Sequence, residues 1–334
     1  MSRPVASIIV PNYNGGEDLL QCVKSLLNTS PKGTEIIIVD NGSRDGSLDL
    51  IKALLPERNI VSLKTNTGFA YACNLGAQQA ESEILVFMNS DTVALKGWIE
   101  PLLEALNTEG VGACTPKLKM LKGSNILNSC GGICDRLGFG WNRGIGETDT
   151  GQYNSTGECF YAVGACLATR KSLFESLGGF DQDYFMYLED LDYSWRLRLA
   201  GYGIRYVPTS TVLHRWMGSI KDRRLVRYLY HRNRLRTILK NYGFQKLHFL
   251  LPVYLTLQVA LIAWLAAAND KIETANVTKA ILWNMRHLKE TLRARLRTQS
   301  SRRVLDKTIE KHMFKGLASI YFALGTLKHP LIRK

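Results

Sequence analysis

The sequence lacks the glycine-rich loops that hold phosphate groups in many nucleotide-binding sheets. Gly-x-Gly-x-x-Gly is missing after the first predicted strand, and Gly-x-x-x-x-Gly-Lys-Ser/Thr is absent. The first absence argues against a dinucleotide-dependent dehydrogenase, and the second against a P-loop enzyme. Any nucleotide must therefore be held by side chains and a metal ion rather than by a helix N-terminus.

Secretion and disulfide signals are also missing. The apolar run within residues 1–11 is too short for a secretory segment and continues into a predicted strand, so export is not expected. The seven cysteines are odd in number and scattered, which favours reduced thiols in a cytosolic compartment. Cys130, Cys134 and Cys159 lack the Cys-x-x-Cys spacing typical of zinc sites.

Acidic residues are scarce in the last third of the chain. Residues 1–214 hold 18 Lys and Arg against 23 Asp and Glu, whereas residues 215–334 hold 25 against 6. This division predicts a domain over residues 1–220 and a basic, mainly helical region over 221–334. The second region is expected to meet an anionic partner: a bilayer surface, a phosphorylated lipid or nucleic acid.

Short aliphatic runs alternate with helical periodicity in the first 90 residues. Strands are predicted at residues 5–10, 35–39, 59–63 and 84–88, and helices at 18–27, 46–55 and 70–80. This βαβα order predicts an α/β fold with a mainly parallel sheet covered by helices on both faces.

Small polar side chains follow three of these strands. Residues 12–14, residues 40–41 and residues 89–91 each come directly after an apolar run. Ligands of open α/β sheets bind beyond the carboxyl ends of the strands, and Asn-Ser-Asp suits a divalent cation shared with phosphates. The alternative is that Asn-Ser-Asp is only a turn, which those residue types favour by themselves.

Four motifs in order resemble the family 2 glycosyltransferases with the GT-A fold. They are the sequences at residues 7–14 (SIIVPNYN), 38–47 (IVDNGSRDGS), 66–74 (NxGFAxxxN) and 89–91 (NSD). The resemblance covers residues 5–220 and is greatest to bacterial rhamnosyltransferase-like enzymes; Gln-x-x-Arg-Trp, typical of processive synthases, is absent. It implies a nucleoside-diphosphate sugar donor, dTDP-rhamnose or a UDP-sugar. The donor-binding residues would be Pro11, Asn12, Tyr13, Asn14, Asp40, Asn41, Asn66, Gly68, Asn74, Asn89 and Ser90.

The same resemblance implies metal ligands. Asp91 would hold Mg²⁺ or Mn²⁺, and His214, which ends a predicted strand at 207–214, would bind the metal or the diphosphate. A lone histidine after a strand is otherwise more often structural. Asn89 replaces the first aspartate of the Asp-x-Asp found in many relatives, which removes one negative charge from the site.

A second cluster of acids lies at residues 189–192. The resemblance implies that Asp190 is the catalytic base and that Glu189 and Asp192 orient the site or the acceptor. The alternative is an acidic first turn of an ordinary helix, where the helix dipole favours carboxylates. The long glycine-rich stretch from 117 to 165 is expected to form acceptor-side loops, with Trp141 and Gly164 as site residues.

The basic region contains an uncharged segment of 19 residues at 250–268, near the lower limit for crossing a bilayer. We expect this helix to lie in or on the membrane rather than span it. Residues 284–315 are basic enough to meet anionic lipid, although they could equally form a solvated face. No RNA-binding module is present, so nucleic acid is not expected; a homo-oligomer is left open.

These features predict an inverting, metal-dependent glycosyltransferase at the cytoplasmic face of the inner membrane, acting on a polyprenyl-diphosphate-linked or growing polysaccharide acceptor. Two alternatives remain. A sugar-phosphate nucleotidyltransferase would need a lysine in the loop after the first strand, which residues 12–16 do not contain. A protein that binds nucleotide sugar or lipid without turnover would be indifferent to loss of Asp190.

Overall fold

A mixed sheet forms the centre of the computed structural model, which describes residues 3–123, 125–215 and 222–316. The strands are β1 Ser7–Asn12, β2 Glu35–Asp40, β3 Ile60–Ser62, β4 Ile84–Met88, β5 Thr92–Ala94, β6 Val111–Met120, β7 Leu127–Ser129, β8 Gly132–Cys134, β9 Gly140–Asn142, β10 Gly157–Glu158, β11 Cys166–Arg170 and β12 Gly203–His214. The helices are α1 Gly16–Thr29, α2 Ser47–Ile51, α3 Phe69–Gln79, α4 Glu100–Asn107, α5 Lys171–Ser176, α6 Glu189–Leu199, α7 Arg223–Asn241, α8 Phe244–Ala267, α9 Lys271–Arg286, α10 Leu288–Ser300 and α11 Asp306–Glu310.

The sheet has a parallel half and a mixed half. Its order is β10-β12-β6-β11-β4-β1-β2-β3, with β5 on β12 and β7 on β6. Strands β3, β2, β1 and β4 are parallel, whereas β11 runs antiparallel between β4 and β6. The carboxyl ends of β1, β2 and β4 therefore meet at one edge, as the α/β prediction requires.

Helices cover both faces of the sheet because successive strand residues point to opposite sides. In β1, Ile8 and Val10 join one apolar core with α1, and Ile9 joins the other core with α3. Helix α3 lies very close to β1, since a Cβ on Gly76 would be 2.4 Å from Cγ2 of Ile9. Residue alternation in the sequence thus decides which helix covers which face.

Several predicted bounds differ from the structure. The helix expected at 46–55 is only α2, and a 3₁₀ turn at Glu57–Asn59 follows it. The stretch from 117 to 165, expected to have no clear elements, contains β7 to β10. These strands are two or three residues long, too short to show periodicity.

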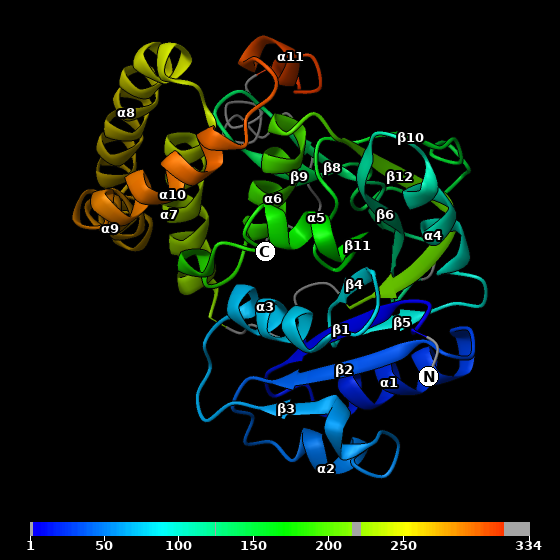
Figure 1. The fold of residues 1–334 in the computed structure, drawn as a ribbon. Helices are drawn as coiled ribbons and strands as arrows, with labels where there is room; N and C mark the ends of the chain where they lie inside the picture. Colours follow the sequence, from blue (N-terminus) through cyan, green and yellow to red (C-terminus); the bar gives the residue numbers. More distant parts are fainter. Residues whose placement is uncertain (1–2, 124, 216–221, 317–334) are drawn as a thin grey trace.

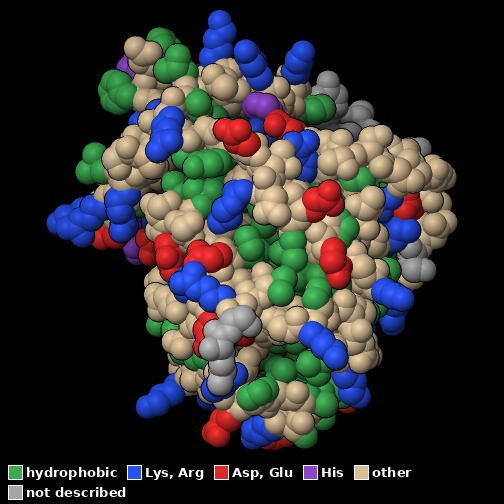
Figure 2. Space-filling view, turned by 45° about the vertical axis from the view of Figure 1, so that its right-hand side comes forward, with side chains coloured by type: hydrophobic (Ala, Val, Ile, Leu, Met, Phe, Trp, Pro, Cys, Tyr) green, Lys and Arg blue, Asp and Glu red, His purple; other side chains and the backbone are tan. Residues whose placement is uncertain are grey.

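The C-terminal helices form a group beside the sheet domain (Figure 1). Helix α7 lies between α6 and the helices α9 and α10, and α8 runs along the outer edge of the molecule. On the face in Figure 2, basic and acidic side chains are interspersed, with hydrophobic side chains between them. The predicted boundary at residue 220 lies outside the described residues.

Candidate active site

The carboxyl ends of β1 and β2 are joined by the side chain of Asn12. Its Nδ2 donates to Oδ1 of Asp40 at 2.8 Å, to Oγ of Ser43 at 3.0 Å and to Oγ of Ser47 at 2.9 Å. The Asp40 carboxylate also accepts from the backbone N–H of Ser43 at 3.1 Å. Asn12 and Asp40 are buried, so the turn after β2 has a fixed shape.

Two further amides shape the loop before α3. Oδ1 of Asn41 accepts from the N–H and hydroxyl of Thr67, and its Nδ2 donates to the carbonyl of Gly68 at 3.0 Å. Oδ1 of Asn66 accepts from the N–H of Gly68 at 2.9 Å. Gly68 has φ of 89°, and a Cβ there would lie 2.4 Å from the carbonyl oxygen of Phe185. Only glycine fits this position.

The other residues expected to bind the donor lie around the carboxyl ends of β1, β2 and β4, but Asn74 has a structural role. Pro11 and Ser90 are buried, Tyr13 is largely exposed, and Asn14 adopts a positive φ. Asn74 bonds through both ends of its amide to the backbone of Phe180, at 2.7 and 2.9 Å. Asn74 therefore fastens α3 to the chain before α6, and its amide groups are already used.

Asp91 and His214 come together although 123 residues separate them. Oδ1 of Asp91 lies 3.2 Å from Nε2 of His214, and Nδ2 of Asn89 lies 3.3 Å from the same nitrogen. Burial favours the neutral acid, but His214 and then Arg215 outweigh it and lower the pKa of Asp91. Asp91 is therefore a carboxylate at neutral pH. The pairing of β12 with β5 brings His214 opposite Thr92 and so beside this acid.

A buried amide orients the His214 ring. Nδ1 of His214 lies 3.0 Å from Oδ1 of Asn128, which can only accept a hydrogen bond. Nδ1 therefore carries a proton, so a cation bound between the two side chains would meet the lone pair of Nε2 beside Oδ1 of Asp91. A carboxylate oxygen and an imidazole lone pair side by side fit a divalent cation, and the partner on Nδ1 is typical of metal-binding histidines. Among the described residues no three His, Cys, Asp or Glu side chains cluster, so phosphate oxygens and water would complete the coordination.

Asp190 lies in the first turn of α6 with part of its side chain exposed. Oδ2 accepts from the N–H of Gly164 at 2.7 Å, and Oδ1 accepts from the N–H of Leu191 at 2.7 Å. Burial raises the pKa of Asp190 to about 6, against the opposing effect of these two hydrogen bonds. A carboxylate with this pKa is ionised at neutral pH and basic enough to take a proton.

Glu189 and Asp192 differ sharply from Asp190. Burial, and then the charge of Asp190, raises the pKa of Glu189 well above its usual range. Asp192 is fully buried and paired with Arg196 at 2.9 Å and Lys240 at 3.0 Å. It points into the interface between α6 and α7 rather than toward an acceptor.

Short contacts connect the two key acids. The N–H of Asn89 donates to the carbonyl of Ala165 at 3.1 Å, and the neighbouring Gly164 donates to Asp190. Burial, and then the charges of Glu189 and Asp91, raise the pKa of Tyr187 to about 12. The backbone contacts bring the Asp190 carboxylate to the loop that bonds to Asn89, two residues before Asp91.

A model of the family described as Glycosyl transferase family 2 matches residues 7–178, more than half of the chain. The chain belongs to this family. The motifs at 7–14, 38–47, 66–74 and 89–91 all fall inside the matched region, so the family resemblance of these residues is confirmed.

Relatives of this glycosyltransferase act on different sugars. The N-acetylglucosaminyl-diphospho-decaprenol L-rhamnosyltransferase of Mycobacterium tuberculosis is 29% identical over 232 residues, covering 63% of this chain and 76% of that protein. The O-antigen biosynthesis protein RfbC of Myxococcus xanthus is 31% identical over 218 residues, covering 62% of this chain and 17% of that protein. A probable N-acetylgalactosaminyltransferase of Caenorhabditis elegans is 29% identical, covering 63% of this chain and 37% of that protein.

Solved structures show that the glycosyltransferase has a GT-A-like fold, as predicted. GalNAc-T7 with UDP, GalNAc and Mn²⁺ gives a TM-score of 0.59 at 17% identity, covering 73% of this chain and 49% of that chain. A mannosyltransferase from Pyrobaculum calidifontis with GDP-Man and Mn²⁺ gives a TM-score of 0.52 at 18% identity, covering 90% of this chain and 86% of that chain. Both of these structural neighbours contain Mn²⁺.

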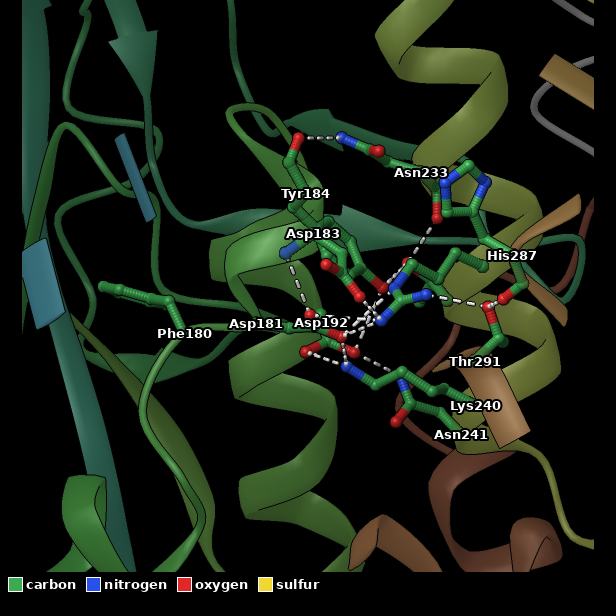
Figure 3. A network of polar contacts seen from close by, with 12 residues as sticks. Phe180, Asp181, Asp183, Tyr184, Asp192, Asn233, Lys240, Asn241, His287 and Thr291 are labelled. Atoms are coloured by element: carbon green, nitrogen blue, oxygen red, sulfur yellow. Dashed lines mark hydrogen bonds and ion pairs between the residues drawn. The ribbon is translucent and has the colours of Figure 1, made fainter. Parts of the chain in front are cut away.

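Helix α7 of the glycosyltransferase keeps part of the basic region inside the protein. Arg232, Arg234, Arg236 and Lys240 of α7 are all buried, so they do not meet an external anion. Arg236 instead pairs with Asp181 and Asp183, and Lys240 pairs with Asp181 and Asp192. Figure 3 shows Lys240 facing Asp181 and Asp192. In the sequence, the spacing of four residues between positions 232, 236 and 240 indicates that these basic side chains share one face of a helix.

Other residues of this site were missed from the sequence. Asn128 lies in a short strand, and Tyr187 stacks with Tyr230 of α7 at 4.9 Å between ring centres. Trp141, expected on the acceptor side, lies in β9 against Phe139 and Phe314, at 6.0 and 5.2 Å. No local pattern marks Asn128 or the tyrosine pair, because their partners are far away in the chain.

Proposed function

We propose that this glycosyltransferase is an inverting, metal-dependent enzyme that transfers one sugar from a nucleoside-diphosphate sugar to a lipid-linked saccharide. What supports the proposal is that Asp190, with a pKa of about 6, bonds to Gly164, whose neighbour Ala165 bonds to Asn89 beside the Asp91–His214 pair. Asp190 suits removal of a proton from the acceptor, and Asp91 suits binding of a cation that contacts the departing diphosphate.

The reaction follows from these positions. Asp190 takes the proton of an acceptor hydroxyl while that oxygen bonds to the anomeric carbon of the donor sugar. The bond from the anomeric carbon to the diphosphate breaks with its electron pair on the diphosphate oxygen. When bound at Asp91 and His214, Mg²⁺ or Mn²⁺ would stabilise that charge. A single displacement inverts the anomeric configuration.

The donor nucleotide would bind where Asn12, Asp40 and Asn41 shape the ends of β1 and β2. Carboxylate and amide groups there can bond a base or a ribose, as in other nucleotide-binding sheets. Rhamnose from dTDP-rhamnose is our proposed sugar, and a polyprenyl-diphosphate-linked saccharide is our proposed acceptor. Support comes from the mycobacterial relative, whose name specifies a decaprenol-linked acceptor and L-rhamnose.

We also propose that the enzyme attaches to the cytoplasmic face of a membrane through α8. Residues Phe244–Ala267 are long and apolar enough to cross a bilayer, and most of the helix is not covered by protein. Phe249 is 74% exposed and Trp264 63% exposed. A helix lying in the interface would bury these rings, and the basic side chains nearby would meet anionic headgroups.

The transfer test incubates the protein with Mg²⁺ or Mn²⁺, polyprenyl-diphosphate-linked N-acetylglucosamine and a panel of nucleotide sugars. We expect dTDP-rhamnose to give product and Asp190→Asn to lose most transfer while still binding nucleotide. Asp49→Asn is the matched control because, within the part of the chain that the structure describes, Asp49 pairs with exposed Lys52 alone. Nucleotide binding by the wild type without turnover of any donor would overturn the proposal in favour of a binding protein.

The membrane test uses sedimentation with vesicles containing phosphatidylglycerol. Phe249→Ser combined with Trp264→Ser should reduce binding by at least about tenfold, while Leu50→Ser, an exposed apolar change on α2, should not. Equal binding by all three proteins would contradict attachment through α8.

A further inference from the structure

The chain just before the proposed base has a strained backbone. Phe185, Tyr187 and Leu188 have φ of 63°, 67° and 67°, a region that side-chain-bearing residues rarely adopt. Phe185 has ψ of −64°, and the N–H of Met186 donates to the carbonyl of Tyr184 at 2.7 Å. This is a γ-turn with positive φ, a rare and strained form. Each such residue costs free energy, so surrounding contacts must hold the segment.

Asn233 of α7 supplies these contacts. Its Nδ2 lies 3.0 Å from the carbonyl oxygen of Tyr184, 2.9 Å from that of Met186 and 2.7 Å from that of Tyr187. An amide NH₂ carries two hydrogens, so three carbonyls share them. Asn233 is fully buried, and Figure 3 shows it beside Tyr184.

Neighbouring side chains hold Asn233 itself. Nε of Arg232 donates to Oδ1 of Asn233 at 2.8 Å, which fixes which end of the amide faces the carbonyls. Nη2 of Arg232 donates to the carbonyls of Asp183 and Tyr184 at 2.8 and 2.6 Å. The guanidinium of Arg232 also lies 4.5 Å from the Trp283 ring centre, so α9 supports α7 here.

The strained segment also touches the donor side of the site. The carbonyl of Phe185 accepts from the N–H of Ala70 at the start of α3, at 3.2 Å, and Phe185 lies against Gly68. Leu188, the last strained residue, is the N-cap of α6, whose second residue is Asp190. Residues 185–188 therefore connect the donor-binding loop, α7 and the base.

We infer that Asn233 is a positioning residue of the transfer reaction: it holds residues 185–188 so that Asp190 and Tyr187 face the donor. Tyr230, one turn earlier on the same face of α7, stacks on Tyr187 with an interplanar angle of 29°. Helix α7 lies beyond the matched family region of 7–178, so this assignment adds to the family resemblance. The inference rests on the proposed role of Asp190.

Asn233→Asp is the sharpest variant. The carboxylate keeps the shape and the Arg232 contact but replaces the donating NH₂ with an oxygen that repels the three carbonyls. Asn233→Ala removes the amide without adding charge and serves if the first variant does not fold. Asn59→Asp is the matched control, because Asn59 likewise donates to a backbone carbonyl, that of Ile36 at 2.7 Å, and lies just before β3 at the far edge of the sheet.

We expect both Asn233 variants to lose at least about tenfold in kcat with little change in donor KM, since small displacements of a catalytic group cost about this much. Hydrogen exchange of residues 184–188 should increase, whereas the control should match the wild type in both measurements. Unchanged kcat per folded molecule, or unchanged exchange in that segment, would overturn the inference. Absence of transfer by the wild type would instead reject the proposed function. The exchange measurement would still test whether Asn233 holds residues 184–188.

Discussion

The two sides of the active site are built from different kinds of contact. On the donor side, neutral amides of Asn12, Asn41 and Asn66 bond to nearby loops, over separations of 2 to 35 residues. On the side of α7, buried charges join segments about 50 residues apart. The amide side gives a fixed shape at low electrostatic cost. The charged side holds two parts of the chain together, and its loss leaves a charge unpaired.

Lys240→Met should have the largest effect on stability. It removes the cation shared by Asp181 and Asp192, although each keeps one arginine partner, so the cost should approach the lower end of the range of about 3–5 kcal/mol for a broken buried pair. The measurement is urea unfolding followed by tyrosine and tryptophan fluorescence. Lys52→Met, at the exposed pair with Asp49, is the control and should change stability by less than about 1 kcal/mol. Equal effects of the two variants would show that the buried charges beside α7 stabilise the protein no more than a surface ion pair does.

Asn41→Ala tests the amide side. It leaves the carbonyl of Gly68 and the N–H of Thr67 without this partner, which should cost about 1–3 kcal/mol of unfolding free energy. The same variant should weaken nucleotide binding, measured by calorimetry, because the loop before α3 loses its shape. Asn59→Ala, which removes a single bond to the carbonyl of Ile36, should destabilise without weakening nucleotide binding.

Asn128→Ala removes the partner of Nδ1 of His214. Loss of such a partner typically weakens metal binding by about tenfold to hundredfold. Calorimetric titration of Mn²⁺ in the presence of nucleoside diphosphate measures this directly, without a transfer assay. Unaltered Mn²⁺ affinity would mean that the orientation of the ring does not depend on Asn128.

Changes of pH should affect activity, through Asp190, and stability, through Asp192, in different pH ranges. Asp190 has a pKa of about 6, and the base acts when ionised, so kcat/KM should fall as pH decreases through about 6, tenfold per unit below it. The pKa of Asp192 is lowered despite its burial, mainly by Lys240 and Arg196, so its stabilisation is present above the ordinary aspartate pKa and is lost as pH falls below about 4. Rate measurements and urea unfolding from pH 4 to 8 should therefore show activity declining before stability does.

The sequence predicted best the positions of those residues that directly follow a strand or precede a helix. Residues 12, 40–41, 66–68 and 89–91 each follow a strand or open a helix, so strand periodicity was enough to place them at one edge of the sheet. The burial of the basic side chains of α7 could not be predicted from the sequence. Charge composition does not reveal that Asp181 and Asp192 lie within reach of Arg236 and Lys240.

The sequence by itself determined the alternation of strands and helices in the donor half, the polar residues at the strand ends and the family, since these follow from periodicity and local motifs. Only the tertiary structure decided that His214 faces Asp91, that α7 is joined to α6 by buried charge, and that Asn233 holds the segment before Asp190. Contacts between residues about 50 to 120 positions apart depend on how sheet and helices pack, and no local pattern in the chain encodes that distance.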